Sequence, residues 1–359
     1  YIYLAEYVSK KNENFLEIKM PIIGTNTPLN NGISLGFGFD QLDLFEKKIK
    51  FPSQLIISFT KALMPSQLFL ISLSKNKMDM NRISSERVLG IPEKFLSEGE
   101  TFNYKSFDGL QISSRLYLPS KHLNYSGPRP LVLYVHGGPT GQERPDFTWF
   151  SMPIIQYLTL HGFVVFVPNV RGSTGYGYSY MAQVFHDWGG KDMRDHIEGL
   201  KKLEQDSRID STKRFVMGRS YGGFMTLSLM SRHPDLWTGG CDLFGPYDLL
   251  GFYDRLPGTW KESMKQVLGD PDKEDDKNFL IERSPKTYMN DLIAPLLVIQ
   301  GRNDPRVLAK ESEEIVDLLR EKGNKVDIII YEDEGHDVIK IKNKIDCYEK
   351  ITSFFLDLI

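Results

Sequence analysis

Cysteine is scarce in this chain of 359 residues, which contains only Cys241 and Cys347. Both stand in apolar or mixed surroundings far apart in the sequence, a pattern that favours buried free thiols in a reducing compartment over a disulfide. We therefore expect a cytoplasmic protein. The histidines and acidic residues show no metal-ligand spacing, so we expect no metal and no other cofactor.

Long apolar runs and a strong charge imbalance are also missing. No apolar run reaches the ~18 residues that a membrane helix needs, and no secretory leader pattern stands at the start. The formal net charge is −3, which gives no reason to expect a nucleic-acid surface. We therefore expect neither a membrane nor a nucleic acid as a partner. The chain opens at Tyr1 rather than Met, which indicates a processed or trimmed product, or part of a longer polypeptide.

The first part of the chain, to about residue 91, has the pattern of β structure. Residues 1–8 alternate between apolar and polar positions, and residues 55–60 and 67–73 are short strand-like runs. This rhythm is typical of antiparallel hairpins, as in sandwich sheets or propeller blades. The number of strands suffices for one or two blades and not for a closed propeller.

From about residue 101 the pattern changes to apolar strands that alternate with segments of helix length. Continuous apolar runs are typical of strands buried on both faces, and the alternation predicts a mostly parallel sheet with helices on both faces. We therefore predict an α/β domain over residues 101–359, preceded by a β-rich region and linker over residues 1–100. The predicted strands are 111–119, 131–135, 163–167, 214–217, 240–244, 296–300 and 326–331, and the predicted helices are 147–162, 191–205, 224–232 and 309–322.

The motif around which this domain is organised is Gly218-Arg219-Ser220-Tyr221-Gly222, between an apolar strand and a helix-like run. A very tight strand-to-helix turn requires nearly side-chain-free residues two positions before and after its centre. Such a turn exposes the Ser220 hydroxyl and directs a helix N-terminus at any negative charge that develops beside it. The motif therefore predicts the nucleophile elbow of an α/β-hydrolase fold.

A serine nucleophile needs a base, and the base needs an orienting acid. In α/β-hydrolases the order along the chain is nucleophile, acid, histidine. Asp304 and His336 each follow a predicted strand, and His336 is the last of the seven histidines. Ligands bind at the carboxyl ends of such strands, so we predict that Ser220, Asp304 and His336 converge as a triad. Taken singly, Asp304 also fits an Asx turn or a helix cap, and His336 also fits a solvated loop.

An acyl-transfer site also needs hydrogen-bond donors for an oxyanion. One predicted donor is the backbone N–H of Tyr221, the residue after the nucleophile. The second is the N–H of Gly138, with Gly137 as the next choice, in the loop that follows the strand 131–135. His136 in the same loop is interpreted as a structural hydrogen-bonding residue. The alternative for this loop is a Gly-Pro turn that binds nothing.

Six ordered motifs resemble the hydrolase domain of the prolyl oligopeptidase family, and in particular its acylaminoacyl-peptidase branch. The resemblance extends from about residue 100 to the end of the chain. In the family a β-propeller precedes the hydrolase and restricts entry to short peptides, and residues 1 to about 90 resemble the last part of such a propeller. The motifs are VHGGP at 135–139, NVRGSTGYG at 169–177, WGGKD at 188–192, GRSYGG at 218–223, NDPRV at 303–307 and EGH at 334–336.

The resemblance implies a serine peptidase that hydrolyses short or N-terminally acylated peptides through an acyl-enzyme intermediate. It also implies that Arg306 binds a substrate carbonyl or terminal group, although a surface salt bridge is the alternative role for this residue. An esterase with the same triad, a dipeptidyl-peptidase-type exopeptidase and a catalytically silent binding module are the other functions considered. Assembly into a homo-oligomer is left open.

Two features have an interpretation from their position alone. Arg219 stands before the serine, where relatives usually carry tryptophan, glycine or histidine. It places a positive charge beside the elbow, which bears on the preference for acidic substrates. Asp192, Asp195 and Glu198 fall at the start of the predicted helix 191–205, where they suit its N-terminal dipole.

Overall fold

The computed structural model describes residues 2–5, 15–18, 33–36, 54–74, 77–88, 90–147 and 150–359. The chain divides into two compact units. The smaller contains Tyr1–Glu93 and Arg144–Pro153, and the larger contains Lys94–Glu143 and Ile154–Ile359. The division at residue 100 into a propeller-like region and a catalytic domain stays a prediction.

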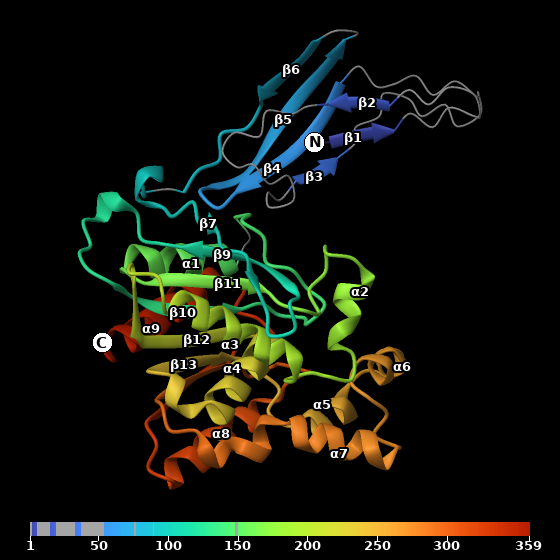
Figure 1. Ribbon diagram of the computed structural model, residues 1–359, viewed down its shortest axis with the longest axis vertical. Helices are drawn as coiled ribbons and strands as arrows, with labels where there is room; N and C mark the ends of the chain where they lie inside the picture. Colours follow the sequence, from blue (N-terminus) through green and yellow to red (C-terminus); the bar gives the residue numbers. More distant parts are fainter. Residues whose placement is uncertain are drawn as a thin grey trace. The chain divides into compact units, whose positions relative to one another are not determined.

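The described strands of the smaller unit are antiparallel and are shown in blue in Figure 1. Its main sheet has the order β3-β4-β5-β6, and a separate hairpin-like pair is formed by β1 and β2. Strands that pair in sequence order are the arrangement of a propeller blade, so the predicted β pattern is confirmed. The strands are β1 (Ile2–Ala5), β2 (Phe15–Ile18), β3 (Ile33–Gly36), β4 (Gln54–Lys61), β5 (Met64–Ser74) and β6 (Lys77–Arg82).

The larger unit is built on a nine-stranded sheet with the order β15-β14-β13-β12-β10-β11-β9-β7, in which β8 pairs with β9. Strands β10 to β15 are all parallel, whereas β9 runs antiparallel to β11. The predicted mostly parallel sheet is therefore confirmed. Its strands are β7 (Glu100–Thr101), β8 (Tyr104–Lys105), β9 (Gln111–Tyr117), β10 (Arg129–Val135), β11 (Val164–Asn169), β12 (Ile209–Arg219), β13 (Gly239–Leu243), β14 (Leu296–Gly301) and β15 (Val326–Tyr331).

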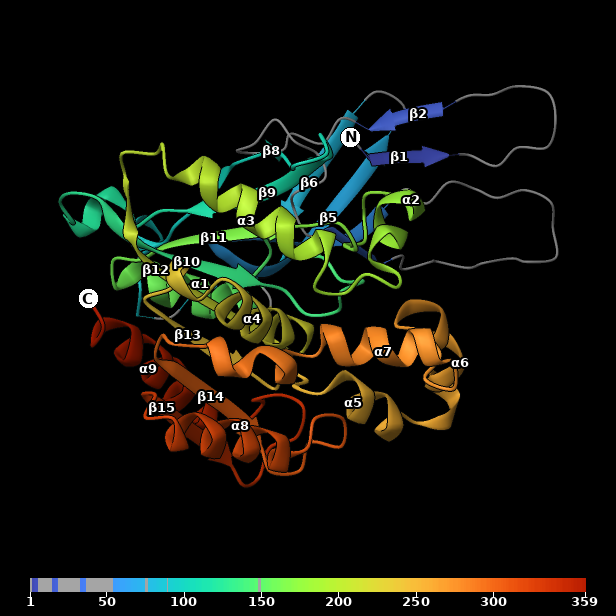
Figure 2. The same cartoon turned by 60° about the horizontal axis from the view of Figure 1, so that its bottom comes forward.

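Helices cover both faces of this sheet (Figures 1 and 2). Three of them, α5, α6 and α7, gather on one side and belong to the long connection between β13 and β14. The α-helices are α1 (Ser151–Leu160), α2 (Tyr178–Met181), α3 (Lys191–Leu203), α4 (Tyr221–Arg232), α5 (Leu249–Arg255), α6 (Gly258–Val267), α7 (Glu274–Arg283), α8 (Ala309–Glu321) and α9 (Ile341–Leu356). The 3₁₀ turns are η1 (Glu93–Phe95), η2 (Lys121–Leu123), η3 (Ala182–Val184), η4 (Pro234–Leu236) and η5 (Pro285–Asp291).

The central strand β12 shows why its apolar run is continuous. Phe215 packs against Phe355 of α9, with ring centroids 4.7 Å apart. Because successive side chains of a strand point to opposite faces, the next residue, Val216, lies in the core on the other face, together with Leu227 of α4. Cys241 and Cys347 are both buried free thiols, as expected.

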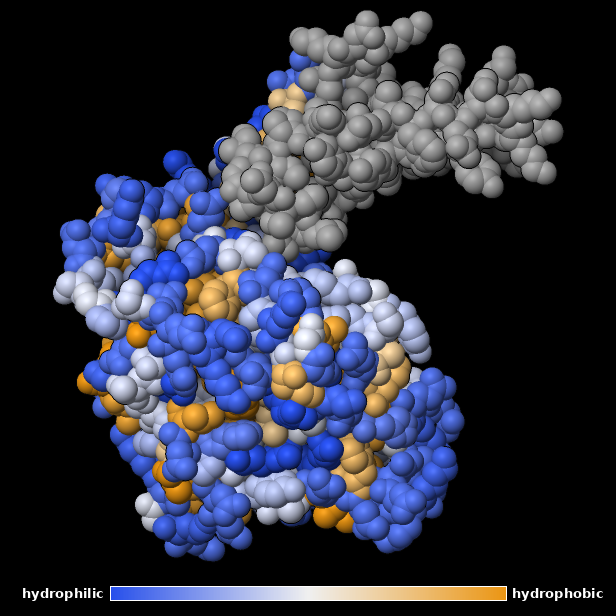
Figure 3. Space-filling model, viewed as in Figure 1, coloured by the Kyte–Doolittle hydropathy of each residue, from blue (hydrophilic) through white to orange (hydrophobic). Residues whose placement is uncertain are grey.

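The surface of the larger unit is mixed in character. On the face seen in Figure 3, hydrophilic side chains predominate and apolar ones lie in small groups between them. None of the helices within the described ranges is both long and apolar enough to cross a lipid bilayer.

Candidate active site

Ser220 lies at the turn between β12 and α4, with backbone angles φ 59° and ψ −117°. A positive φ is rare for a residue with a side chain, and backbone strain of this kind gathers at functional sites. A β-carbon at Gly218 or Gly222 would lie only 2.5 Å or 2.2 Å from the carbonyl oxygen of Val135 in the adjacent strand. The predicted need for two glycines is therefore steric, since any side chain would push the elbow away from β10.

The structure brings the side chains of Ser220, His336 and Asp304 into one hydrogen-bonded chain. Nε2 of His336 lies 2.9 Å from Oγ of Ser220, and Nδ1 lies 2.6 Å from Oδ2 of Asp304. Since a carboxylate can only accept, Nδ1–H donates to Asp304 and Nε2 is left to accept from the serine hydroxyl. The imidazole also meets the ring of Phe244 edge-on, with centroids 5.9 Å apart.

Asp304 is held as an anion by the groups around it. Its side chain is fully buried, and Oδ1 accepts the backbone N–H groups of Arg306 at 2.8 Å and Val307 at 3.0 Å. Burial by itself would raise the pKa of this carboxyl, but the hydrogen bond and charge of His336 and the two N–H groups outweigh it, and the pKa lies below its ordinary value. The Asx-type turn and the contact with the histidine are thus both present.

The glycine loop predicted to supply an oxyanion donor lies beside the nucleophile. A β-carbon at Gly137 would stand 3.1 Å from the carbonyl oxygen of Arg219 and 3.9 Å from Cβ of Ser220. Gly138 has φ 140°, a conformation that residues with side chains rarely adopt. The other predicted donor, the N–H of Tyr221, belongs to the first residue of α4, where N–H groups have no partner within the helix.

His136 is buried below this loop and makes two contacts. Nδ1 donates to the carbonyl oxygen of Gly137 at 2.8 Å, and Nε2 lies 2.8 Å from Oγ of Ser173. Burial lowers the pKa of the imidazole, so the neutral form is favoured. Both contacts agree with the structural role that we expected from the sequence.

Arg306 is exposed, and its guanidinium lies over the ring of Trp260 in α6, with Cζ 4.8 Å from the ring centroid. Trp260 is itself 43% exposed. Among the described residues no carboxylate forms an ion pair with Arg306, so the salt bridge that was the alternative role is not seen in this structure. An arginine on an aromatic face keeps its donors available to a further partner.

Asp192 lies in the first turn of α3, as predicted, but it is also fully buried, which the sequence did not show. Its carboxylate accepts the phenol O–H of Tyr221 and the backbone N–H groups of Gly189 and Met193, the last two at 3.1 Å and 2.7 Å. Trp188 packs edge-on against Tyr221, with centroids 5.1 Å apart. Burial raises the pKa of Asp192 to about 6. The signal was the WGGKD motif, which holds both the tryptophan and the acid.

The role of Asp195 was misjudged from the sequence, because this residue lies beyond the first turn of α3 and is fully buried. It forms a two-bond ion pair with the buried Arg171, in which Nε and Nη2 each lie 2.8 Å from a carboxylate oxygen. Asp195 therefore serves to compensate a buried charge rather than a helix end.

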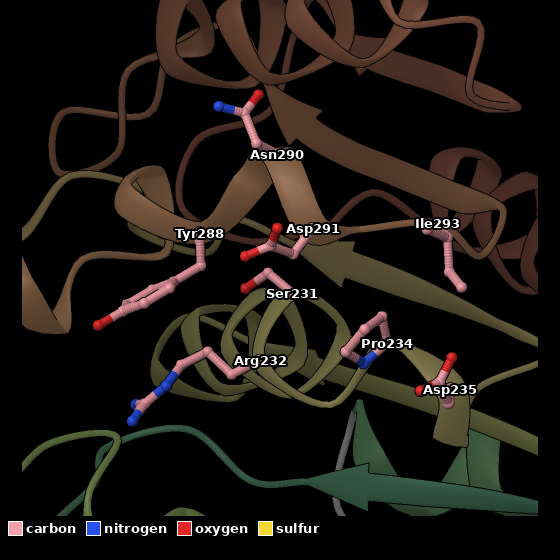
Figure 4. A pocket seen from close by; sticks show the side chains of 8 residues that line it. All are labelled: Ser231, Arg232, Pro234, Asp235, Tyr288, Asn290, Asp291 and Ile293. Carbon is pink, nitrogen blue, oxygen red and sulfur yellow. The ribbon is translucent and has the colours of Figure 1, made fainter.

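A surface hollow of about 620 Å³ lies at the other end of α4 from the elbow. Ser231 and Arg232, at the end of that helix, line it together with Tyr288 and Asn290 of η5 (Figure 4). Because α4 has 12 residues, its two ends are separated by about 18 Å at the usual rise per residue. The hollow is thus separate from the cluster of Ser220.

The strand order and the Ser–His–Asp cluster at the ends of β12, β14 and β15 define an α/β-hydrolase. The comparison with known proteins agrees with this class. The family model described as "Prolyl oligopeptidase family" (Peptidase_S9) matches residues 148–359. This chain belongs to the prolyl oligopeptidase family.

Relatives of several kinds share this part. Dipeptidyl aminopeptidase BIII of Pseudoxanthomonas mexicana is 34% identical over 259 residues, which are 70% of this chain and 37% of that protein. The structure of a puromycin hydrolase superposes with a TM-score of 0.78 at 21% identity, over 86% of this chain and 46% of that one. An acylaminoacyl peptidase solved with Z-Gly-Gly-Phe-chloromethyl ketone gives 0.73 at 25% identity, over 86% and 48%. The chain thus spans less than half the length of these relatives.

Proposed function

We propose that this protein is a serine peptidase that hydrolyses short or N-terminally acylated peptides through an acyl-enzyme on Ser220. The observation that carries the proposal is the chain of contacts in which the serine Oγ lies 2.9 Å from Nε2 of His336 and Nδ1 lies 2.6 Å from Asp304. This is the geometry in which an imidazole can remove the hydroxyl proton while a carboxylate stabilises the resulting cation.

In the proposed mechanism, His336 takes the proton of Ser220 as Oγ attacks the substrate carbonyl carbon. The N–H groups of Tyr221 and Gly138, with Gly137 as the second choice, bind the oxyanion. The imidazolium then gives its proton to the leaving amine, and the amine departs. A water molecule then attacks the acyl carbon with His336 again as base. The imidazolium returns the proton to Oγ as the bond between the acyl carbon and Oγ breaks, which releases the carboxylic acid and regenerates the serine.

The preference for an acylated N-terminus follows from the charge at Arg306. An exposed guanidinium that has no carboxylate partner among the described residues attracts carbonyl oxygens and repels a free ammonium group. Trp260, on which it stacks, adds an aromatic face that suits an apolar side chain or acyl group. A neutral, blocked substrate fits this pair better than a cationic N-terminus.

The second candidate is a dipeptidyl-peptidase-type exopeptidase. What favours it is the 34% identity to a protein named dipeptidyl aminopeptidase BIII. Such an enzyme must bind a free ammonium group, so it needs an anionic group that pairs with the substrate. The contacts described above do not identify such a group. We also propose a cytoplasmic location, on the ground that both cysteines are buried free thiols.

Three chromogenic substrates separate these functions: an N-acetylated alanine p-nitroanilide, an Ala-Ala p-nitroanilide with a free amine, and p-nitrophenyl acetate. We expect the acetylated anilide to be cleaved with the highest kcat/KM. Preference for the free dipeptide would instead support the exopeptidase, and cleavage of the ester alone would support an esterase.

Reaction with a fluorophosphonate probe tests the nucleophile directly. We expect mass spectrometry to locate the label on Ser220, and we expect Ser220→Ala to abolish both labelling and turnover. The matched control is Ser207→Ala, because Ser207 is an exposed serine in the turn before β12. Retained turnover in Ser220→Ala would rule out the proposed nucleophile.

A further inference from the structure

An ion pair joins the chain neighbours of the proposed nucleophile and base. Arg219 is the last residue of β12 and precedes Ser220, and Asp337 directly follows His336. Nη1 of Arg219 donates to Oδ2 of Asp337. The Arg219 side chain is 30% exposed and that of Asp337 is 14% exposed. Solvent and salt screen such a half-buried pair less than a surface pair.

The loop that carries His336 connects β15 to α9. The hydrogen bonds described next join this loop to the Asp304 loop and to α9 rather than to the turn of Ser220. The N–H of Asn303 donates to the carbonyl oxygen of Glu334 at 2.9 Å, which ties the loop to that of Asp304. The buried carboxylate of Glu334 accepts the N–H of Lys340 at 2.9 Å and Nδ2 of Asn343 at 2.8 Å, which ties it to the start of α9. The acid and the base are thus held together by backbone, whereas the elbow belongs to a different strand.

We propose that Arg219 and Asp337 are positioning residues, whose ion pair holds the imidazole of His336 within hydrogen-bond reach of Ser220. Each partner is one residue from a proposed catalytic group. The ion pair is therefore a second connection between the Ser220 turn and the His336 loop, beside the 2.9 Å contact between Nε2 and Oγ. The inference rests on the proposed function. It also changes the expectation from the sequence, because the charge of Arg219 is compensated by Asp337 and is not offered to acidic substrates.

The expected size of the effect follows from the sensitivity of catalysis to alignment, since a displacement of ~1 Å can lower a rate by about 100-fold. A lost positioning contact changes kcat, whereas a lost substrate contact raises KM. Lys344 of α9 also interacts electrostatically with Asp337. Removal of the Asp337 carboxylate therefore abolishes both interactions, whereas removal of the Arg219 guanidinium leaves the one with Lys344.

The experiment compares Arg219→Gln, Asp337→Asn and the double variant with the wild-type protein. We expect kcat and the rate of Ser220 labelling by a fluorophosphonate to fall about 10- to 100-fold in each single variant, with KM within about threefold. The double variant is expected to be no slower than the slower single variant, because the two residues act as a unit. Arg219→Lys keeps the charge and is expected to recover most of the rate.

The matched control is Lys340→Gln, which cuts the ion pair between Lys340 and Asp333 in the same loop. That pair has a 2.6 Å contact, and its side chains are 56% and 53% exposed. It does not reach the elbow, so we expect a change of less than about twofold. The melting temperature of every variant shows whether lost activity reflects lost folding. If a neutral variant unfolds, Arg219→Lys, which keeps the charge, remains the test.

Additive losses in the double variant, unchanged labelling rates, or a rise in KM with kcat preserved would each overturn the inference. If the wild-type protein itself is not labelled at Ser220, the proposed function fails and the inference falls with it. A labelled wild type with unaffected variants refutes the inference alone.

Discussion

A buried acid beside the elbow helix allows a stability prediction with a definite sign. Asp242 of β13 is fully buried, and Oδ1 accepts the N–H of Gly245 at 3.0 Å. Within the described part of the chain, Oδ2 has no hydrogen-bond partner. Burial raises the pKa of this carboxyl to about 8, although the hydrogen bond from Gly245 opposes the change. At neutral pH the folded protein therefore holds Asp242 in its protonated form.

The magnitude follows from proton linkage. In the unfolded chain an aspartate has its ordinary pKa of about 3.9, so unfolding releases a proton at every pH between about 4 and the folded value of about 8. Over that interval the free energy of unfolding falls by about 1.4 kcal/mol for each pH unit. The contribution of Asp242 is complete below pH ~4 and is lost as the pH rises through about 8, which amounts to at most about 6 kcal/mol.

Asp242→Asn removes the titrating proton while it keeps the shape and an oxygen for the N–H of Gly245. Urea unfolding at pH 5, 6, 7 and 8 measures the free energy of both proteins. We expect the variant to gain on the wild type as the pH rises, by roughly 1 kcal/mol for each unit. The control is Asp317→Asn, because Asp317 is exposed on α8. Parallel pH profiles for Asp242→Asn and the wild type would refute a buried neutral carboxyl.

Three further substitutions have clear expectations. Asp304→Asn replaces an acceptor by an amide that can present a donor to the imidazole, so we expect kcat to fall roughly 10³- to 10⁴-fold in the anilide assay with little change in melting temperature. Gly222→Ala places a β-carbon 2.2 Å from the carbonyl oxygen of Val135, and we expect a loss of at least about 3 kcal/mol in urea unfolding. Tyr221→Phe removes the donor to Asp192, and we expect a loss of about 1–3 kcal/mol in the same assay; an unchanged midpoint would contradict the described contact.

The cluster of Ser220, Asp304 and His336 shows how far sequence reasoning reaches. Each residue follows an apolar strand, and parallel strands place their carboxyl ends at one edge of a sheet. The order along the chain and the glycines of the elbow therefore sufficed to predict which side chains meet. Their catalytic roles remain proposals that the labelling experiment tests.

Other elements were not predictable in this way. Helices α2, α5, α6, α7 and α9 were missed. For α7 the reason is that Glu274–Arg283 is rich in charge and only one of its residues, Leu280, is buried, so it has no clear apolar face. The place of Asp192 at the start of a helix could be predicted from the sequence, whereas its contact with the phenol of Tyr221 could not, because Tyr221 belongs to another helix. Sequence patterns predict the contacts of a residue only when its partner lies nearby in the sequence.

The sequence by itself determined the elements that depend on neighbours along the chain: the buried strands, the elbow with its two glycines, and the order of nucleophile, acid and base. Tertiary structure alone decided which distant charges compensate one another, as in the pairs Arg219–Asp337 and Arg171–Asp195. The physical reason is that turn and strand preferences are set by a few adjacent residues, whereas a buried charge is stable only beside a partner that the fold brings to it. The ion pair of Arg219 therefore depends on the fold, which places the loop of His336 beside the end of β12.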